Sequence, residues 1–376
     1  AVLEATIAGE RAGSVRCSVR RKPSGEYVVN MKFRKIPHTD LEVSVICLGS
    51  MNWGQQNTEA DAHEQLDYAM TQGINFIDTA EMYPVPPTKE KQGLTESYIG
   101  SWLAKRKNRN DLIIASKVSG PSTLVRTRNN AARLDKAGIR SAIDGTLERL
   151  GVDHVDLYQV HWPQRKTNFF GIRGFVGPIE KDEVSIEETL DALAEVVRAG
   201  KARYIGVSNE TAWGVAEYLR LAREKNLPRI VTIQNQYSLT NRTYEVGLSE
   251  LTLREGVGLL VYSPLSKGVL TGKYLGGAKP RGARFTLFER DSGRYNPPHA
   301  QEAIRRYVEL AKAHGLDPSQ MALAFINDRP FVTANIIGAT SLEQLKADIA
   351  SIDLVLPPEV LEGIATIYRE IPDPTS

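Results

Sequence analysis

Four residues of the chain have the side-chain types that reduction of a carbonyl group requires: Asp78, Tyr83, Lys117 and His161. Hydride addition to a carbonyl carbon leaves an alkoxide, whose oxygen needs a proton and a hydrogen-bond donor. Tyrosine can supply both, but its usual pKa of about 10 makes it a modest acid. A lysine ammonium beside the phenol would lower that pKa, and a carboxylate paired with the lysine would keep the ammonium charged and in place. A neutral histidine could orient the carbonyl.

Each of these residues also has a structural interpretation. Asp78 could cap a loop, Lys117 could simply pair with it, His161 could be a partly buried imidazole beside Trp162, and Tyr83 could pack. The catalytic interpretation is favoured by their joint spacing. Asp78, Lys117 and His161 are 39 and 44 residues apart, about one strand–helix repeat each, and Tyr83 follows Asp78 by five residues.

From about residue 31 the chain repeats a helix, a glycine and a short apolar strand. Thr58 and Asp61 look like a capping box, and a helix with Ile139 and Ile143 on one face should stop at Gly151. Ser185 with Glu188, ahead of an apolar face, predicts the start of another helix. Eight segments are predicted to be strands: residues 43–48, 75–78, 112–116, 155–160, 203–207, 230–234, 258–262 and 334–338.

Strands that alternate with helices predict a parallel sheet. Eight such units over residues 31–376 match an α/β fold of the closed (β/α)8 TIM barrel type, with long rim loops and an N-terminal β-hairpin over residues 31–40 at its floor. An open, doubly wound sheet is the competing fold. No linker-like stretch divides residues 31–376, which we therefore expect to form one domain. In such barrels the reactive groups stand where strands end, all on one rim.

Residues 1–30 differ in composition from the rest, with five basic and three acidic residues and few large apolar ones. A basic, serine-containing N-terminal segment is typical of an organelle transit peptide. The run Val15-Arg16-Cys17-Ser18 resembles the processing region of plastid transit peptides, which predicts a plastid (chloroplast stroma) location. The alternative is a disordered tail, with the protein in the cytoplasm.

Composition narrows the possible functions. The chain has 376 residues, with 47 Lys and Arg against 45 Asp and Glu, a formal net charge of +2. Such a balance offers no global field that would attract nucleic acid or an anionic membrane, and no apolar run approaches the roughly 18 residues that span a bilayer. The two cysteines cannot build a disulfide framework, and Cys47 should be a buried thiol. No Cys/His cluster has zinc-ligand spacing, so no metal is expected.

Two negative findings concern the hydride source. No G-x-G-x-x-G follows a strand, which excludes a dinucleotide held on a Rossmann turn. Residues 268–274 are one position short of a phosphate loop and end in Tyr, which excludes an NTPase motif. At the predicted strand ends, however, Ser208, Asn209 and Gln234 could bond a nicotinamide carboxamide. A basic stretch that includes Lys273 and Arg284 suits phosphate oxygens, unless it is a solvated loop.

Three segments resemble motifs of the aldo-keto reductase superfamily: residues 75–83, 112–118 and 156–163. The resemblance runs from about Phe33 to Ile364, and is closest to the branch with bacterial and plant oxidoreductases and the potassium-channel β-subunits. It implies that Tyr83 is the proton donor, that Lys117 and Asp78 tune it, and that His161 orients the substrate.

The resemblance also implies that NADP(H) binds extended across the rim. Tyr262 would stack on the nicotinamide ring, Ser263 would begin the pyrophosphate segment, and Thr340 and Gln344 would contact the 2′-phosphate. Asp348 stands where the family often has an adenine-binding Asn. The implied cofactor residues are Gly49, Ser50, Met51, Asp78, Ser208, Asn209, Gln234, Tyr262, Ser263, Pro264, Leu265, Lys273, Arg284, Gly338, Thr340, Gln344 and Asp348.

Two long rim loops, residues 119–138 and 163–184, should shape the substrate pocket because rim loops vary while a barrel stays constant. The predicted pocket residues are Trp53, Tyr83, His161 and Trp162. The predicted function is NADPH-dependent reduction of an aldehyde or ketone, with a small-molecule carbonyl as the partner and the oligomeric state left open. The alternative is a cofactor-sensing regulatory subunit with slow reductase activity. A Schiff-base Lys117 in a phosphate-binding barrel is disfavoured, because Asp78 would keep the lysine protonated.

Overall fold

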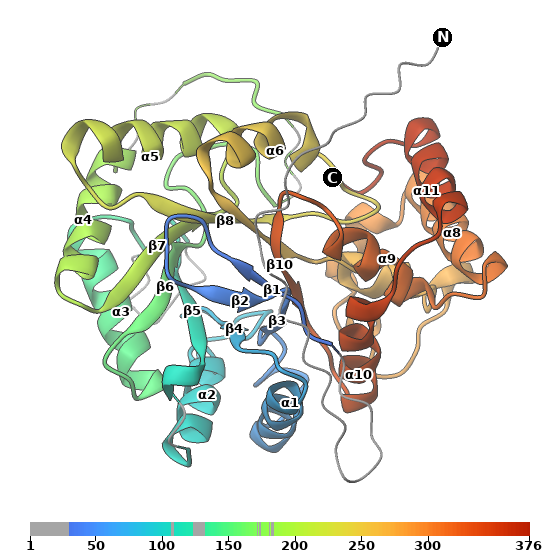
Figure 1. Ribbon diagram of the computed structural model, residues 1–376, viewed down its shortest axis with the longest axis horizontal. Helices are drawn as coiled ribbons and strands as arrows, with labels where there is room; N and C mark the ends of the chain where they lie inside the picture. Colours follow the sequence, from blue (N-terminus) through green and yellow to red (C-terminus); the bar gives the residue numbers. More distant parts are fainter. Residues whose placement is uncertain are drawn as a thin grey trace.

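Eight parallel strands close into a barrel, which confirms the predicted fold and excludes the open sheet. The structure is a computed structural model that describes residues 30–376 except 107–108, 123–131, 171, 173, 180 and 182–183. Neighbours around the barrel follow the order β10-β3-β4-β5-β6-β7-β8-β9 (Figure 1). The strands are β3 (Ile46–Gly49), β4 (Phe76–Asp78), β5 (Ile113–Val118), β6 (Val155–Val160), β7 (Ala202–Ser208), β8 (Ile230–Gln236), β9 (Gly258–Tyr262) and β10 (Val332–Ile337).

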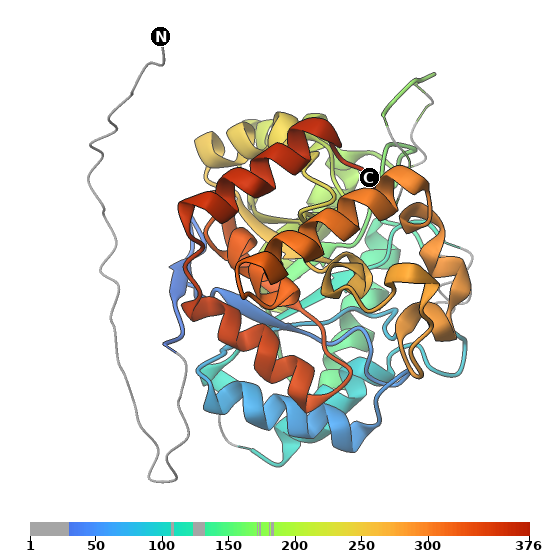
Figure 2. The same ribbon diagram turned by 90° about the vertical axis from the view of Figure 1, so that its right-hand side faces the viewer.

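Helices surround the barrel, and α8 and α11 run beside each other on its outside (Figure 2). The short α7 (Arg284–Leu287) lies in the long connection that follows β9. The longer helices are α1 (Glu59–Thr71), α2 (Leu94–Ala104), α3 (Lys136–Leu150), α4 (Ile186–Arg198), α5 (Ala212–Lys225), α6 (Tyr244–Glu255), α8 (Pro298–Ala313), α9 (Pro318–Asn327), α10 (Leu342–Ala350) and α11 (Pro358–Glu370).

The predicted helix boundaries are confirmed where the sequence carries capping residues. The Thr58 side chain accepts from the Asp61 backbone N–H and Asp61 returns the bond, a complete capping box. Ser185 accepts from the N–H of Glu188 at the start of α4. Gly151 ends α3 with a φ of 64°, a left-handed conformation that suits glycine.

A two-stranded antiparallel hairpin precedes the barrel, as expected, but with different boundaries. It pairs β1 (Phe33–Lys35) with β2 (Glu42–Ser44). The prediction of a hairpin within residues 31–40 and a single strand over 43–48 was therefore wrong: the apolar run contains both the second hairpin strand and β3.

The chain changes its backbone hydrogen-bonding partner, from the hairpin to the barrel, at Val45, which lies between β2 and β3. Its N–H donates to the carbonyl of Lys32 on the hairpin side, over 2.8 Å, and its carbonyl accepts from Asn335 of β10, over 2.7 Å. Both bonds are to backbone groups, and Val45 is as apolar as its neighbours. The residue types therefore do not mark the boundary.

The hairpin fills one end of the barrel with apolar side chains. Ile36, Leu41 and Val43 pack with Cys47 and Phe76 of the strands in one buried cluster. Cys47 is fully buried, which confirms the prediction for this thiol. We call this end of the barrel, where strands begin, the floor, and the opposite end, where strands finish, the rim.

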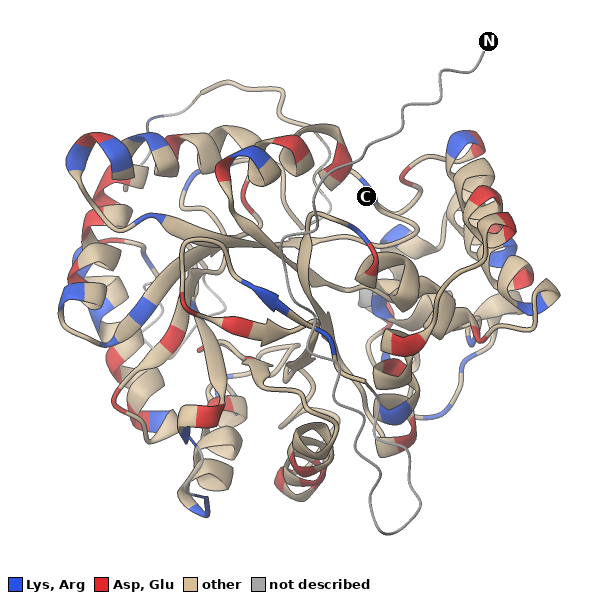
Figure 3. Ribbon diagram, viewed as in Figure 1, with Lys and Arg blue, Asp and Glu red and all other residues tan. Residues whose placement is uncertain are grey.

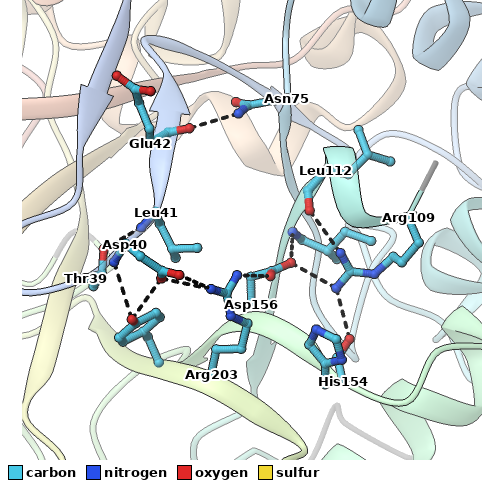
Figure 4. Close-up of polar contacts among 12 residues, drawn as sticks. Thr39, Asp40, Leu41, Glu42, Asn75, Arg109, Leu112, His154, Asp156 and Arg203 are labelled. Carbon is cyan, nitrogen blue, oxygen red and sulfur yellow. Dashed lines mark hydrogen bonds and ion pairs between the residues drawn. The ribbon is translucent and has the colours of Figure 1, made fainter.

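Ion pairs and hydrogen bonds of charged side chains connect the segments at the floor (Figure 4). Asp156 is the second residue of β6 and accepts from Arg109 Nη2, Arg203 Nη1 and the backbone N–H of Ile114, each over 2.9 Å. Arg203 also donates to both carboxylate oxygens of Asp40, which lies between the two hairpin strands. The network therefore ties the hairpin to strands on the far side of the floor.

Basic and acidic residues are intermixed on the outer helices in the view of Figure 3. Several are paired on one helix, such as Arg220 with Glu217 and Glu224 on α5. Of the described helices, none combines the length and apolar character that crossing a membrane requires.

Candidate active site

The four predicted catalytic residues meet at the rim. Asp78 is the last residue of β4, Lys117 is the penultimate residue of β5, and His161 directly follows β6. Tyr83 lies in the loop after Asp78. Because these three strands are consecutive in a closed parallel barrel, their ends open on the same face.

The Lys117 ammonium is fully buried and directs its hydrogens at three oxygens. It donates to Asp78 Oδ2 over 2.6 Å, to the carbonyl of Thr79 over 2.8 Å and to Tyr83 Oη over 3.3 Å. The lysine thus links the carboxylate to the phenol. Tyr83 is itself only 7% exposed, so this contact lies almost entirely out of water.

The second oxygen of Asp78 is also bonded. Oδ1 accepts from Gln234 Nε2 over 2.8 Å and from Gln159 Nε2 over 3.5 Å. The carboxylate is therefore held by two neutral amides and one ammonium, which compensates for its removal from water. In this arrangement the side-chain amide of Gln234 is a hydrogen-bond donor to Asp78.

Burial and charge act on the catalytic pKa values in different directions. Burial raises the pKa of Tyr83 above its usual value of 10.0, and this outweighs the lowering by the Lys117 ammonium. The lysine therefore lowers the pKa of the phenol as expected, but the desolvation of the phenolate is the larger effect. For Lys117, burial alone would lower the pKa, but the charge of Asp78 and the contact with Tyr83 raise it. The lysine is cationic and the tyrosine is a neutral phenol at neutral pH.

His161 faces the phenol across the rim. Its ring centroid lies 5.7 Å from that of Tyr83, with the rings nearly perpendicular at 79°. Burial, together with the positive charge of Lys117, lowers the pKa of the imidazole well below 6.5, so it is neutral at neutral pH. Its Nδ1 atom is buried and has no hydrogen-bond partner among the described residues. The imidazole therefore retains unused hydrogen-bonding capacity beside the phenol.

An amide network joins the ends of β6, β7, β8 and β9. Asn209 donates through Nδ2 to the carbonyl of His161 over 2.9 Å and to Ser208 Oγ over 3.1 Å. Its Oδ1 accepts from the Tyr262 hydroxyl over 2.6 Å, while Ser208 Oγ donates to the carbonyl of Gln234 over 2.7 Å. The structure thus brings these four predicted cofactor residues together next to the catalytic group.

The loop after β9 has an unusual backbone. Ser263, Ser266 and Lys267 have φ values of 53°, 50° and 57°, in the left-handed region that favours glycine. The Ser266 hydroxyl bonds to Ser238 over 2.9 Å and to Thr240 over 2.8 Å, which holds the loop against the segment that follows β8. The other two predicted residues of this loop are buried or half-buried: Pro264 and Leu265.

Two predicted phosphate-binding cations come from the same long connection. Arg284 carries a positive charge near enough to Tyr83 to lower the pKa of the phenol slightly. Lys273 is half-buried, and burial lowers its pKa while the charge of Asp348 opposes that shift. Asp348 is buried, and burial together with the carboxylate of Asp317 raises its pKa to about 7, against the effect of Lys273.

The remaining predicted cofactor residues flank β10. Gly49 ends β3, and a Cβ atom there would lie 2.7 Å from Cγ2 of Ile336, so glycine permits the close approach of β3 and β10. Ser50 Oγ donates to the carbonyl of Asp78 over 2.7 Å, and Met51 is half-buried beside it.

After β10, Gly338 is exposed and Thr340 and Gln344 interact. The backbone N–H and the hydroxyl of Thr340 both donate to Gln344 Oε1 over 3.1 Å. Asn57, from the loop after β3, donates to the carbonyl of Thr340 over 3.0 Å. The segments after β3 and β10 therefore lie together at one side of the rim.

The two predicted pocket tryptophans have different positions. The Trp162 ring lies 4.9 Å from His161 and 5.7 Å from Phe170, so it packs between the imidazole and the 163–184 loop. Trp53 is fully buried, and its indole N–H donates to Gln65 on α1. A pocket position for Trp53 stays a prediction.

Sequence reasoning missed several members of the site. Gln159 and the carbonyl of Thr79 complete the partners of Asp78 and Lys117. Glu81 accepts from the backbone N–H of Ser119 over 2.7 Å and fixes the loop that carries Tyr83. The signal for Gln159 was available: it lies on β6 two positions before His161, and side chains two positions apart in extended chain point to the same side.

Comparison with known proteins agrees with this geometry. The pattern of the aldo/keto reductase family matches residues 45–369. Protein tas of Escherichia coli is 57% identical over 343 residues, covering 90% of this chain and 98% of that protein. YrpG of Bacillus subtilis, named as an uncharacterized oxidoreductase, is 33% identical over 90% of this chain and 96% of its own length.

A protein of Schizosaccharomyces pombe, whose name refers to a voltage-gated potassium channel subunit beta, is 30% identical over 91% of this chain and 95% of its own length. These relatives confirm the branch that the sequence motifs resemble. With the family pattern and the closed barrel in agreement, the chain belongs to the aldo/keto reductase family and is an oxidoreductase of that fold.

Proposed function

We propose that the protein reduces an aldehyde or ketone to an alcohol, with NADP(H) as the hydride donor and Tyr83 as the proton donor. The observation that carries this proposal is the buried chain of contacts Asp78–Lys117–Tyr83, with the neutral imidazole of His161 beside the phenol. A nicotinamide cofactor is general in this family; the preference for NADP(H) is the finer part of the proposal.

The residues divide the proton transfer among them. The high pKa of Tyr83 keeps the phenol protonated and ready to donate. When the proton leaves, the phenolate lies 3.3 Å from the Lys117 ammonium, which stabilises the new negative charge. Asp78 holds the ammonium in this position. The neutral His161 can donate a hydrogen bond to the carbonyl oxygen and so orient it towards the phenol.

The rim residues fit a dinucleotide. The amides and hydroxyls of Asn209 and Ser208 suit a nicotinamide carboxamide, and Lys273 and Arg284 supply charge for phosphate oxygens. The second lone pair of Asn209 Oδ1 and the exposed backbone of Gly338 offer further contacts. Bound NADPH would supply the hydride. Because Thr340 and Gln344 are neutral, a preference for the 2′-phosphate would rest on the two cations.

The test is a panel of aldehydes and ketones with purified protein, followed by NADPH absorbance and repeated with NADH. We expect turnover with NADPH, and near-abolition of turnover in Tyr83→Phe with cofactor binding retained. Tyr204→Phe, which removes a hydroxyl at the floor, is the matched control and should be as active as wild type. Wild-type turnover in Tyr83→Phe would remove this residue from the mechanism.

A cofactor-sensing regulatory subunit is the second candidate, favoured by the similarity to the fission yeast protein named for a channel subunit. It predicts very tight NADPH retention with negligible turnover across the whole panel. The two candidates share the cofactor residues and differ in rate, so one set of measurements separates them.

The proposed partner is a small carbonyl compound, without nucleic acid or membrane insertion, in keeping with the mixed surface charge. A plastid location remains a prediction from the composition of residues 1–30, of which 1–29 lie outside the described residues, and the relatives give it no support. Imaging of a fluorescent protein fused behind residues 1–40 in leaf cells tests it: fluorescence confined to the cytoplasm would contradict plastid import.

A further inference from the structure

The loops after β6 and β7 are tied together by an ion pair between Arg165 and Glu210. Arg165 Nη1 donates to Glu210 Oε2 over 2.9 Å, and Nη2 donates to Oε1. The two side chains are 11% and 3% exposed, so the pair is almost removed from water. Neither residue belongs to the groups proposed above to touch the carbonyl or the nicotinamide.

The surroundings hold this pair from several sides. Thr211 donates through its backbone N–H to Glu210 Oε1 over 2.7 Å and accepts from Arg165 Nη2 over 3.1 Å. The Arg165 guanidinium lies 5.0 Å from the ring centroid of Trp213. A Cβ atom on Gly214 would collide with the Glu210 carboxylate, so glycine allows α5 to begin directly against the pair. The bidentate geometry is therefore built into the start of the helix.

The pair reaches the candidate active site through Asn209, the residue before Glu210. Asn209 has a φ of 53°, and its amide bonds both His161 and Tyr262. The backbone of Glu210 is fixed by Asn235, which accepts from its N–H over 3.3 Å and donates to its carbonyl over 3.0 Å. A non-glycine residue keeps a left-handed conformation when its surroundings enforce it. Glu210 is held through both its side chain and its backbone, and it therefore keeps the neighbouring Asn209 in this conformation.

We propose that Arg165 and Glu210 are positioning residues that set the place of the His161 imidazole. The loops after β6 and β7 are joined by two neighbouring contacts, which we call the clamp. In the first, Asn209 donates to the carbonyl of His161; in the second, Glu210 pairs with Arg165, four residues after His161. This inference rests on the proposed carbonyl reduction. Because reacting groups tolerate little displacement, loss of the clamp slows the step in which His161 takes part.

The first measurement is the steady-state rate of benzaldehyde reduction by the full chain with saturating NADPH. Glu210→Gln keeps the shape of the side chain but loses the charge, and we expect kcat to fall by about tenfold. Arg165→Lys keeps the charge but loses the bidentate geometry, and should fall between that variant and wild type. The matched control is Glu217→Gln, which breaks an exposed pair with Arg220 on α5 and should leave kcat unchanged.

The second measurement separates positioning from a merely structural role. Glu210→Gln is combined with His161→Ala, and kcat is compared in a double-mutant cycle. We expect Glu210→Gln to have no further effect once the imidazole is absent. An equal loss of kcat in both backgrounds, or an unchanged kcat in the single variant, would overturn the inference. If Glu210→Gln does not fold, the same cycle is run with Arg165→Lys. Absence of turnover in wild type would be a failure of the proposed function instead, and is visible before any variant is made.

Discussion

Two buried aspartates, Asp156 at the floor and Asp78 at the rim, are each held by cationic and neutral donors, but the two networks have different roles. Asp156 is surrounded by Arg109, Arg203 and a backbone N–H, all of which are fixed parts of the floor (Figure 4). Asp78 pairs with Lys117, whose ammonium continues to the Tyr83 hydroxyl. The first network contains only structural groups of the floor, whereas the second ends at the Tyr83 phenol, which can lose its proton.

The comparison shows how one fold separates stability from chemistry. A guanidinium is planar and always charged, and its fork suits a static lock between the hairpin and the strands. A lysine ammonium is compact and responds to its surroundings, which suits a group that must stabilise a charge appearing during the reaction. Two buried ion pairs of the same charge type are therefore expected to answer differently to substitution.

The largest expected effect is at the rim. Replacing both partners, Asp78→Asn with Lys117→Met, avoids leaving a buried charge unpaired, so the protein should fold and melt close to wild type. Loss of the ammonium beside the phenol should lower kcat roughly a thousandfold. Aldehyde reduction and a thermal melt check the two parts. Wild-type turnover in the double variant would contradict the view that the rim pair, unlike the floor network, takes part in the chemistry.

At the floor, Asp156→Ala removes the buried acceptor that Arg109, Arg203 and the backbone N–H of Ile114 share. We expect the free energy of unfolding to fall by about 3 kcal/mol, with kcat of the folded protein unchanged, as measured by urea unfolding and aldehyde reduction. Asp144→Ala, which breaks an exposed pair with Lys201, is the control and should change stability by less than about 1 kcal/mol. A fall in kcat for Asp156→Ala would show that the floor contributes to the chemistry.

Asp348 is a buried carboxyl for which the described part of the chain provides no ion-pair partner of the kind seen in the two networks. Its pKa of about 7 in the folded state lies above the ordinary 3.8, so the folded protein binds the proton more tightly than the unfolded chain. The stability from this group is complete below pH 3.8 and is lost as pH rises through about 7.

Asp348→Asn should therefore be more stable than wild type at pH 8, by on the order of 2 kcal/mol. The difference should disappear at acid pH. Urea unfolding at pH 5 and pH 8 measures it. Equal stability of the two proteins at pH 8 would contradict a carboxyl that is costly to ionise in this place.

The smallest expected change is in the pH profile of reduction. His161 has a pKa well below 6.5 and Tyr83 one above 10, so both keep their active protonation states between these limits. The value of kcat/KM should be flat from about pH 7 to about pH 9. A clear fall within that range would mean that the phenol is more acidic than its burial indicates.

The periodic parts of the chain were predictable. The spacing of Ile139 and Ile143, the cap at Thr58 and the glycine at position 151 each reflect local geometry, which depends on residue type. The strand ends carrying Asp78 and Lys117 followed from the strand–helix repeat. The parallel barrel then required these ends to meet.

Three features could not be predicted from the sequence and were found only in the structure. The hairpin boundary at Val45 depends on backbone partners 13 and 290 residues away in the sequence, and an apolar run does not reveal them. The direction of the Tyr83 pKa shift depends on how completely the phenol is buried, a sum over many loops. The Arg165–Glu210 pair joins residues 45 positions apart.

Several apolar side chains of the long loop after β6 are exposed and belong to neither buried network: Phe170, Ile172, Phe175, Val176 and Ile179 are 52%, 61%, 55%, 95% and 90% exposed. A protein engineer could diversify this stretch by directed evolution while the hairpin lock and the lysine–aspartate pair remain intact. Substrate choice could then change without each new variant having to be rescued for folding.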